Sequence, residues 1–221
     1  YLTNSNVFFR DKTKEIILIS KIKNLDYFFD LKNKEKKLNI LGNLFGTKFN
    51  FNWEKNFSNP YTTSSNIKFK NPNLNISSKF DKENENFIKA ETKISFLRNI
   101  LDLNYKFNKE NIEINNNNKK IINNSKLIGK IDLDPFYFDL NLILSGISIE
   151  TLLNNVFLNL YKTNKSTNLN FNGNLKINLN EINNRLFENL VININFLEEK
   201  ISLNKSSLNL KKIGKINFSD P

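Results

Sequence analysis

The feature that most constrains the fold of this chain is an alternation of apolar and polar residues with a period of two. Between residues 169 and 180 every second position is Asn or Lys, and the positions between them carry Leu169, Phe171, Gly173, Leu175, Ile177 and Leu179. An α-helix repeats every 3.6 residues and cannot sort these two sets onto opposite faces, whereas a strand does so by its geometry. The pattern therefore predicts a half-buried strand with one apolar face.

The same alternation recurs along most of the chain, and short polar stretches separate its occurrences at intervals of about 8–12 residues. That spacing is typical of an antiparallel meander. We therefore predict a mainly β fold: a long antiparallel, strongly twisted sheet that forms an open trough or groove. Soft loops are expected near residues 56–66 and 108–126. The other alternating stretches are residues 49–53, 101–107, 136–144, 190–196, 201–203, 208–210 and 216–218.

One stretch has helical spacing instead. Ile149, Leu152, Leu153, Val156, Phe157 and Leu160 form a continuous apolar stripe at the i, i+3, i+4 spacing. Ser148 is a suitable N-cap, and Glu150 lies in the first turn, where the helix dipole favours an acidic side chain. The pattern predicts a short amphipathic helix near 148–161 that packs on the sheet or closes its end.

Residue types that most catalytic sites need are missing. The chain has no His and no Cys, which removes the usual general base, thiolate chemistry and disulfides. Asp132 and Asp134 are two residues apart, as paired carboxylates would be, and Ser202 and Lys205 have a spacing at which Lys can activate Ser. Neither pair has the partners that catalysis requires. We expect no enzyme activity, no cofactor and no metal site.

The ends and the charge of the chain say less about its function. The chain contains no Met, begins at Tyr1 and ends at Pro221, so we interpret residues 1–221 as a single β-rich segment of a longer protein. Its net charge of +11 permits contact with nucleic acid or anionic lipid. The lysines are scattered along the chain, and codon bias explains their number together with the high Asn content. We therefore expect no nucleic-acid partner.

Several segments together resemble a known family. The stretches 171–177 and 211–218, together with 38–45 and 131–136, resemble the AsmA-like envelope proteins of Gram-negative bacteria, including those of the TamB and YhdP type. This resemblance implies a long sheet coiled into an open trough that bridges the periplasm. It implies an anchor in the inner membrane, supplied by a segment outside this chain, and partners among inner- and outer-membrane components. The implied function is phospholipid transport between the two membranes and outer-membrane biogenesis.

Physical chemistry gives such a trough a use. An acyl chain gains about 0.8 kcal/mol for each CH₂ group that it buries, so an apolar groove can hold phospholipid acyl chains without specific polar contacts. The residues predicted to line the groove are Phe136, Phe138, Leu140, Leu142, Leu169, Phe171, Leu175, Ile177, Ile192 and Ile194.

The alternation fits a second architecture equally well. A closed β-sandwich buries the same parity of residues in its core. The alternative prediction is therefore a ligand-free structural or adhesive sandwich or solenoid of a secreted protein, which a regular repeat and a dry core would favour.

Overall fold

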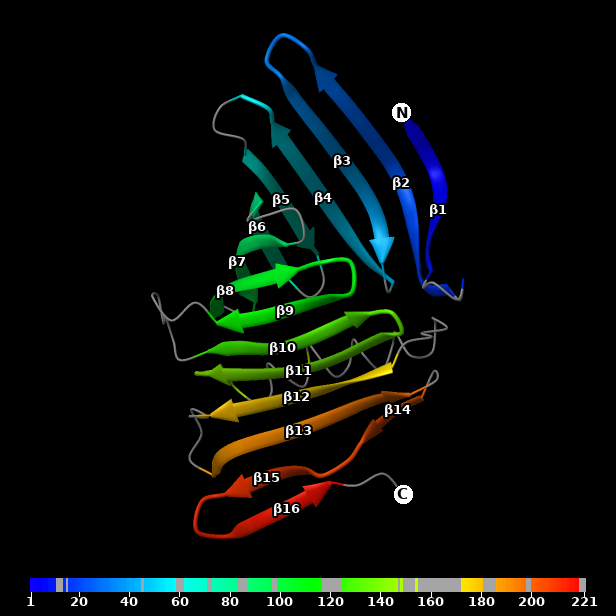
Figure 1. The fold of residues 1–221 in the computed structure, drawn as a ribbon. Helices are drawn as coiled ribbons and strands as arrows, with labels where there is room; N and C mark the ends of the chain where they lie inside the picture. The colour runs from blue at the N-terminus through cyan, green and yellow to red at the C-terminus, as the bar shows by residue number, and fades with distance from the viewer. Residues whose placement is uncertain are drawn as a thin grey trace.

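The computed structural model describes residues 1–10, 14, 16–44, 46–58, 62–70, 73–82, 87–96, 99–116, 125–146, 148, 154, 172–180, 186–197 and 200–218. These residues form one open sheet of 16 strands, which confirms the mainly β fold class. The direction of the strands changes steadily across the sheet: β1 to β5 run steeply in Figure 1, whereas β9 to β13 run nearly level. The sheet is therefore strongly twisted, as strands of L-amino acids require.

The strands follow one another in the sheet almost in sequence order, from β1 at one edge to β16 at the other, and β14 pairs with β13 beside β15. Their bounds are β1 Leu2–Arg10, β2 Ile16–Asp30, β3 Glu35–Leu44, β4 Thr47–Asn56, β5 Thr62–Phe69, β6 Leu74–Lys82, β7 Ile88–Phe96, β8 Asn99–Phe107, β9 Asn111–Asn116, β10 Lys126–Leu133, β11 Phe136–Ser145, β12 Asn172–Asn180, β13 Phe187–Leu197, β14 Lys200–Leu203, β15 Ser206–Leu210 and β16 Gly214–Phe218.

The meander has one interruption, because β11 and β12 pair in parallel while the other described pairs are antiparallel. A parallel pair needs a connection of about a dozen residues or more, and residues 146–171 join these two strands. The helix predicted near 148–161 belongs to this connection. Apart from Ser148 and Asn154 it lies outside the described residues, and the prediction is not confirmed.

The stretches predicted as soft loops contain strand residues. β5 already begins at Thr62, and β9 occupies Asn111–Asn116, so the connections are shorter than 56–66 and 108–126. Thr suits the half-buried surface of a strand, and the Thr/Ser cluster at the start of β5 pairs with both β4 and β6. A side-chain cap forms the turn before β9, where the carboxamide oxygen of Asn108 accepts hydrogen bonds from the backbone NH groups of Glu110 and Asn111.

The register carries one apolar parity through the whole sheet. Directly opposed residues of neighbouring strands lie on the same face. Ile40 in β3 faces Phe51, which faces Ile67, which faces Ile76 and then Ile94. Leu140 in β11 faces Leu175 and then Ile194 in the same way. We call this side of the sheet the apolar face and the opposite side the polar face.

Within the described residues, two packed clusters form most of the core, and both lie on the apolar face. The first is centred on Leu144, Ile177, Leu179 and Ile194 in β11 to β13, and the second on Leu101, Leu103 and Ile114 in β8 and β9. Leu142 packs against both clusters, so the apolar packing is continuous from β7 to β15.

Close packing on the apolar face requires glycine at two positions. A Cβ on Gly173 would lie 2.5 Å from the ring of Phe138, which covers this glycine from β11. The ring of Phe196, from β13 on the other side, approaches the Phe138 ring to 5.4 Å between centroids. Gly42 lies under Phe49 in the same manner, because its Cβ would lie 2.8 Å from that ring.

The polar face carries charges of opposite sign in directly opposed positions. Lys79 faces Glu91, Lys93 faces Asp102, and Lys130 faces Asp139. Such cross-strand pairs stabilise the register in which they meet, since a slip of one residue would move every side chain to the other face.

Candidate functional site

The structure places eight of the predicted groove-lining residues on one surface. Phe136, Phe138, Leu140 and Leu142 lie on β11, Leu175 and Ile177 on β12, and Ile192 and Ile194 on β13, and all of them share the apolar face. The remaining two, Leu169 and Phe171, lie outside the described residues.

Burial divides these eight residues into two groups. Ile177, Ile192 and Ile194 are 2%, 5% and 1% exposed and belong to the core cluster. The four residues of β11 and Leu175 are half-buried and keep part of their surface accessible. The three isoleucines therefore act in packing, and any ligand on this part of the sheet would contact the half-buried residues.

The more accessible part of the apolar face lies at the N-terminal end of the sheet. Tyr27 and Phe29 in β2 are 54% and 46% exposed, and Val7 and Phe9 in β1 are also exposed. The half-buried residues Leu38, Ile40, Phe51 and Trp53 in β3 and β4 continue this surface. The sequence-based prediction missed this area because residues 25–29 carry apolar residues on both parities.

Acidic residues avoid the apolar face. From β2 to β12, each Asp or Glu in a described strand has the parity of the polar face. These residues are Asp26, Asp30, Glu35, Glu54, Asp81, Glu91, Asp102, Glu113, Asp132 and Asp139. The apolar face is therefore free of carboxylates over this part of the described sheet.

Two lysines that face each other directly nevertheless lie on the apolar face. Lys36 in β3 and Lys55 in β4 face each other directly, at the end of the strands nearest the β2–β3 turn. Lys36 Nζ lies 5.2 Å from the centre of the Phe29 ring and 5.0 Å from the centre of the Phe57 ring, and Lys55 Nζ also lies 5.0 Å from the Phe57 centre. Both ammonium groups thus lie on one aromatic ring, at cation–π distance.

Two carboxylates at this end of the strands, those of Asp30 and Glu35, have other partners. The carboxylate of Asp30 accepts hydrogen bonds from the backbone NH groups of Lys32 and Asn33 at 2.8 and 3.0 Å, and the NH of Asn33 in particular lowers the pKa of this carboxyl group. Glu35 pairs with Lys37 at 3.0 Å on the polar face, and this hydrogen bond raises the pKa of Lys37. Within the described residues, no carboxylate pairs with Lys36 or Lys55.

A row of small hydroxyl side chains crosses the middle of the apolar face. The row consists of Ser65, Ser78 and Thr92, which face one another in turn across β5 to β7. Trp53 in β4 and Leu103 in β8 lie at its two ends. The hydroxyl groups of Ser78 and Thr92 are 2.8 Å apart and share a buried hydrogen bond, which satisfies both of them away from water.

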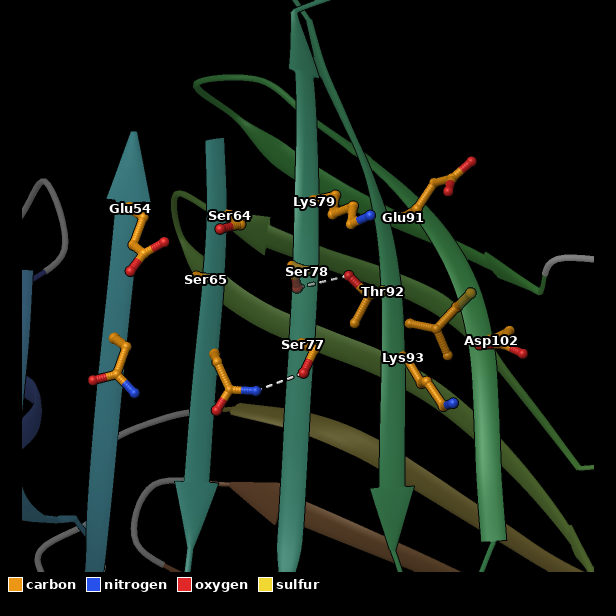
Figure 2. Close-up of a pocket in the computed structure, with 13 residues that line it drawn as sticks. Glu54, Ser64, Ser65, Ser77, Ser78, Lys79, Glu91, Thr92, Lys93 and Asp102 are labelled. Atoms are coloured by element: carbon orange, nitrogen blue, oxygen red, sulfur yellow. Dashed lines mark hydrogen bonds between the residues drawn. The ribbon is translucent and has the colours of Figure 1, made fainter. Parts of the chain in front are cut away.

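A hollow of about 570 Å³ crosses the same five strands, and polar residues form most of its lining. Figure 2 shows its residues on neighbouring strands, with Glu54 on β4, Lys79 on β6 and Glu91 on β7. All five of its charged side chains have the parity of the polar face, and Lys79 and Lys93 directly oppose Glu91 and Asp102. This hollow therefore belongs to the polar face, where its lysines already have neighbours of opposite charge.

The weak catalytic patterns do not come together into a site. Asp132 pairs with Lys130 at 2.7 Å on the surface of β10, and that hydrogen bond raises the pKa of Lys130. Lys205 lies in the turn after β14, and the Ser202 hydroxyl accepts a 3.3 Å hydrogen bond from the Asn204 carboxamide. The described part of the chain holds no group of three acidic residues placed to bind a metal ion.

Comparison with known proteins adds no relative. No protein-family model, no curated protein and no solved structure matches this chain. Among the described residues, no helix has the length and apolar character needed to cross a membrane.

Proposed function

We propose that this chain is a non-enzymatic, lipid-binding segment whose apolar face holds phospholipid acyl chains. The observation that carries the proposal is one continuous apolar parity, free of carboxylates from β2 to β12, together with the exposed apolar side chains of β1 and β2. Soluble domains rarely leave an extended apolar surface open, and such surfaces mark contacts with ligands, membranes or other proteins.

The chemistry of this surface suits acyl chains better than it suits polar ligands. Burial of apolar area contributes about 25 cal/mol per Å², without any directional requirement. The rows Leu38–Trp53 and Ile40–Phe51–Ile67 offer aliphatic and aromatic contacts. These rows contain no carboxylate that a bound acyl chain would have to remove from water. An extended acyl chain lying across these rows would gain apolar contact at each strand that it crosses.

The wider role remains part of the proposal. We propose an AsmA-like envelope protein that acts in the periplasm, is anchored in the inner membrane through a segment outside this chain, and moves phospholipid toward the outer membrane. The open, strongly twisted sheet supports this reading, since such a protein needs a surface that lipid can enter along its length. Its partners would be phospholipid and components of the two membranes.

Native mass spectrometry of the purified chain tests the lipid proposal, followed by extraction and identification of what it retains. We expect phospholipid to remain bound through purification and to be released by organic solvent. A folded chain that carries no lipid and acquires none from phospholipid vesicles would contradict the proposal. That result would favour the alternative of a ligand-free structural or adhesive protein.

A matched pair of variants separates the two faces in the same experiment. Phe29→Asp adds a charge to the exposed part of the apolar face, whereas Phe28→Asp adds the same charge to the exposed polar-face neighbour. Both side chains are partly in water, so neither substitution should unfold the sheet. We expect Phe29→Asp to reduce the retained lipid and Phe28→Asp to leave it unchanged.

A further inference from the structure

We propose that Lys36 and Lys55 together bind the phosphate of an anionic phospholipid whose acyl chains lie on the apolar face. This inference rests on the proposed lipid function and adds to it a position for the headgroup and a preference for negatively charged lipid. It begins from two like charges that face each other directly on adjacent strands. Such a pair opposes folding unless something of opposite charge lies between its members.

The position of the two lysines is unusual for this chain. The described cross-strand neighbours on the polar face bring lysines opposite acidic residues at Lys37–Glu54, Lys79–Glu91 and Lys93–Asp102. Lys89 and Lys106 also face each other there, but each has an acidic residue opposite it on its other side, Asp81 and Glu113. The apolar face of β2 to β5 carries no carboxylate that could serve Lys36 and Lys55 in that way. An anion from outside the chain would neutralise this pair of lysines, as acidic residues neutralise the lysines of the polar face.

Aromatic rings hold the two ammonium groups in place. Phe57 lies 5.0 Å from both nitrogens, and Phe29 lies 5.2 Å from that of Lys36, so the rings restrict where the two charges can go. Both lysines are half-buried, and their aliphatic stems can lie along the apolar surface while the charged ends stay near water. This arrangement holds two donors close to each other before any ligand arrives.

The surroundings fit an amphipathic ligand better than a free anion. From the lysine pair, the apolar face continues along β3 and β4 through Leu38 with Trp53 and then Ile40 with Phe51. The β2–β3 turn beside the lysines lies at the top of Figure 1, at the outer end of these strands. A phospholipid would therefore place its phosphate at the lysines and its acyl chains along the rows that follow.

The experiment uses the full chain and vesicles that contain equal amounts of phosphatidylglycerol and phosphatidylcholine. After incubation the protein is isolated again, and mass spectrometry quantifies each lipid bound to it. Each lysine near an anionic lipid contributes an affinity factor of about five at low salt. We expect the wild type to retain phosphatidylglycerol in excess, and Lys36→Gln/Lys55→Gln to lose most of that excess while still retaining lipid.

The control keeps the same change in net charge. Lys48→Gln/Lys68→Gln removes two exposed lysines from the polar face of β4 and β5. This variant should retain the excess of phosphatidylglycerol. An equal loss in both double variants would overturn the inference, because it would assign the preference to net charge alone. Circular dichroism confirms that each variant keeps its strand content.

Other outcomes separate this inference from the function on which it rests. If the wild type binds both lipids equally and the lysine variant does the same, lipid binding stands and the headgroup position is wrong. If no lipid is bound by any form of the protein, the proposed function itself fails. If glycerol phosphate displaces the bound phosphatidylglycerol as readily as vesicle lipid does, the lysines bind a free phosphate and the lipid assignment is wrong.

Discussion

The two ends of this sheet carry the same alternating pattern, and they differ in how much of their apolar side chains is exposed to solvent. In β11 to β13 the apolar parity is packed away from water, with Leu144 and Leu179 at 0% exposure. In β1 and β2 several side chains of the same face are about half exposed, as Phe9 and Phe29 show, although Ile22 is buried at 4%. Both ends nevertheless belong to one continuous register. Alternation along a strand therefore specifies which side chains share a face, and not whether anything covers that face.

This difference implies that the two ends of the apolar face have different roles, one in stability and one in binding. The C-terminal strands supply a packed cluster that holds the sheet together, and substitutions there should act on stability. The N-terminal strands supply the accessible surface, and substitutions there should act on binding.

The largest expected effect comes from a cavity in the packed end. Ile177→Ala should lower the free energy of unfolding by about 2–5 kcal/mol, because buried methyl groups are lost and their space stays partly empty. Phe29→Ala removes a larger side chain from the exposed end and should change that free energy by about 0.5 kcal/mol or less. Urea denaturation followed by circular dichroism measures both. Equal losses would contradict the division between the two ends.

The next effect concerns the glycine beneath Phe138. Gly173→Ala should destabilise the sheet by about 1–3 kcal/mol, because the added methyl group meets the Phe138 ring. The double variant Gly173→Ala/Phe138→Leu should recover part of that loss, since a smaller side chain leaves room for the methyl group. Thermal unfolding of the single and double variants checks this. If the double variant is no more stable than Gly173→Ala, the ring contact is not the cause.

A smaller effect is expected on the polar face. Lys93→Glu places two acidic residues opposite each other in β7 and β8 and should cost about 0.2–1 kcal/mol. Lys130→Glu in β10 should cost more, because Lys130 faces both Asp139 and Glu113 and pairs with Asp132. The exchange Lys93→Glu/Asp102→Lys should restore stability in urea denaturation. Failure of the exchange would mean that these charges do not act as a pair.

The smallest effect is confined to the β2–β3 turn. The Asp30 carboxylate accepts hydrogen bonds from the backbone NH groups of Asn33 and Lys32, and the bond from Asn33 lowers its pKa the most. The pKa therefore lies below the usual 3.8, and the stability that this carboxylate adds to the turn is fully present above that pH. Stability from this group is lost only as the pH falls through its lowered pKa. Amide exchange at Lys32 and Asn33, followed by nuclear magnetic resonance, should then speed up locally. A carboxyl titration midpoint at or above 3.8 would contradict this assignment.

Much of the sheet could be predicted from the sequence, because period-two patterns report local geometry. The strand around Ile177 and the face that it shares with Ile192 follow directly from alternation. The parallel pairing of β11 with β12 did not follow, since pairing direction depends on how the connection between the strands runs. The start of β5 was missed because Thr and Ser are common in loops and strands alike.

The candidate site was harder to predict than the fold. Lys36 and Lys55 are far apart in the sequence, and their meeting depends on the register of β3 against β4. The exposure of Tyr27 and Phe29 depends on which strands lie near the edge of the sheet, and no local pattern encodes that. Conversely, Ile177 and Ile194 were expected at a groove surface, yet the structure buries them in the first core cluster.

The most direct test of the central claim uses Trp53, the single tryptophan of the chain, which lies half-buried on the apolar face. Its fluorescence is recorded after exchange with phosphatidylglycerol brominated along the acyl chains, and after exchange with the same lipid without bromine. If acyl chains lie on the apolar face, the brominated lipid should quench Trp53 and the unbrominated lipid should not. Unchanged fluorescence in a protein that demonstrably retains the brominated lipid would contradict the account, because the lipid would then lie elsewhere.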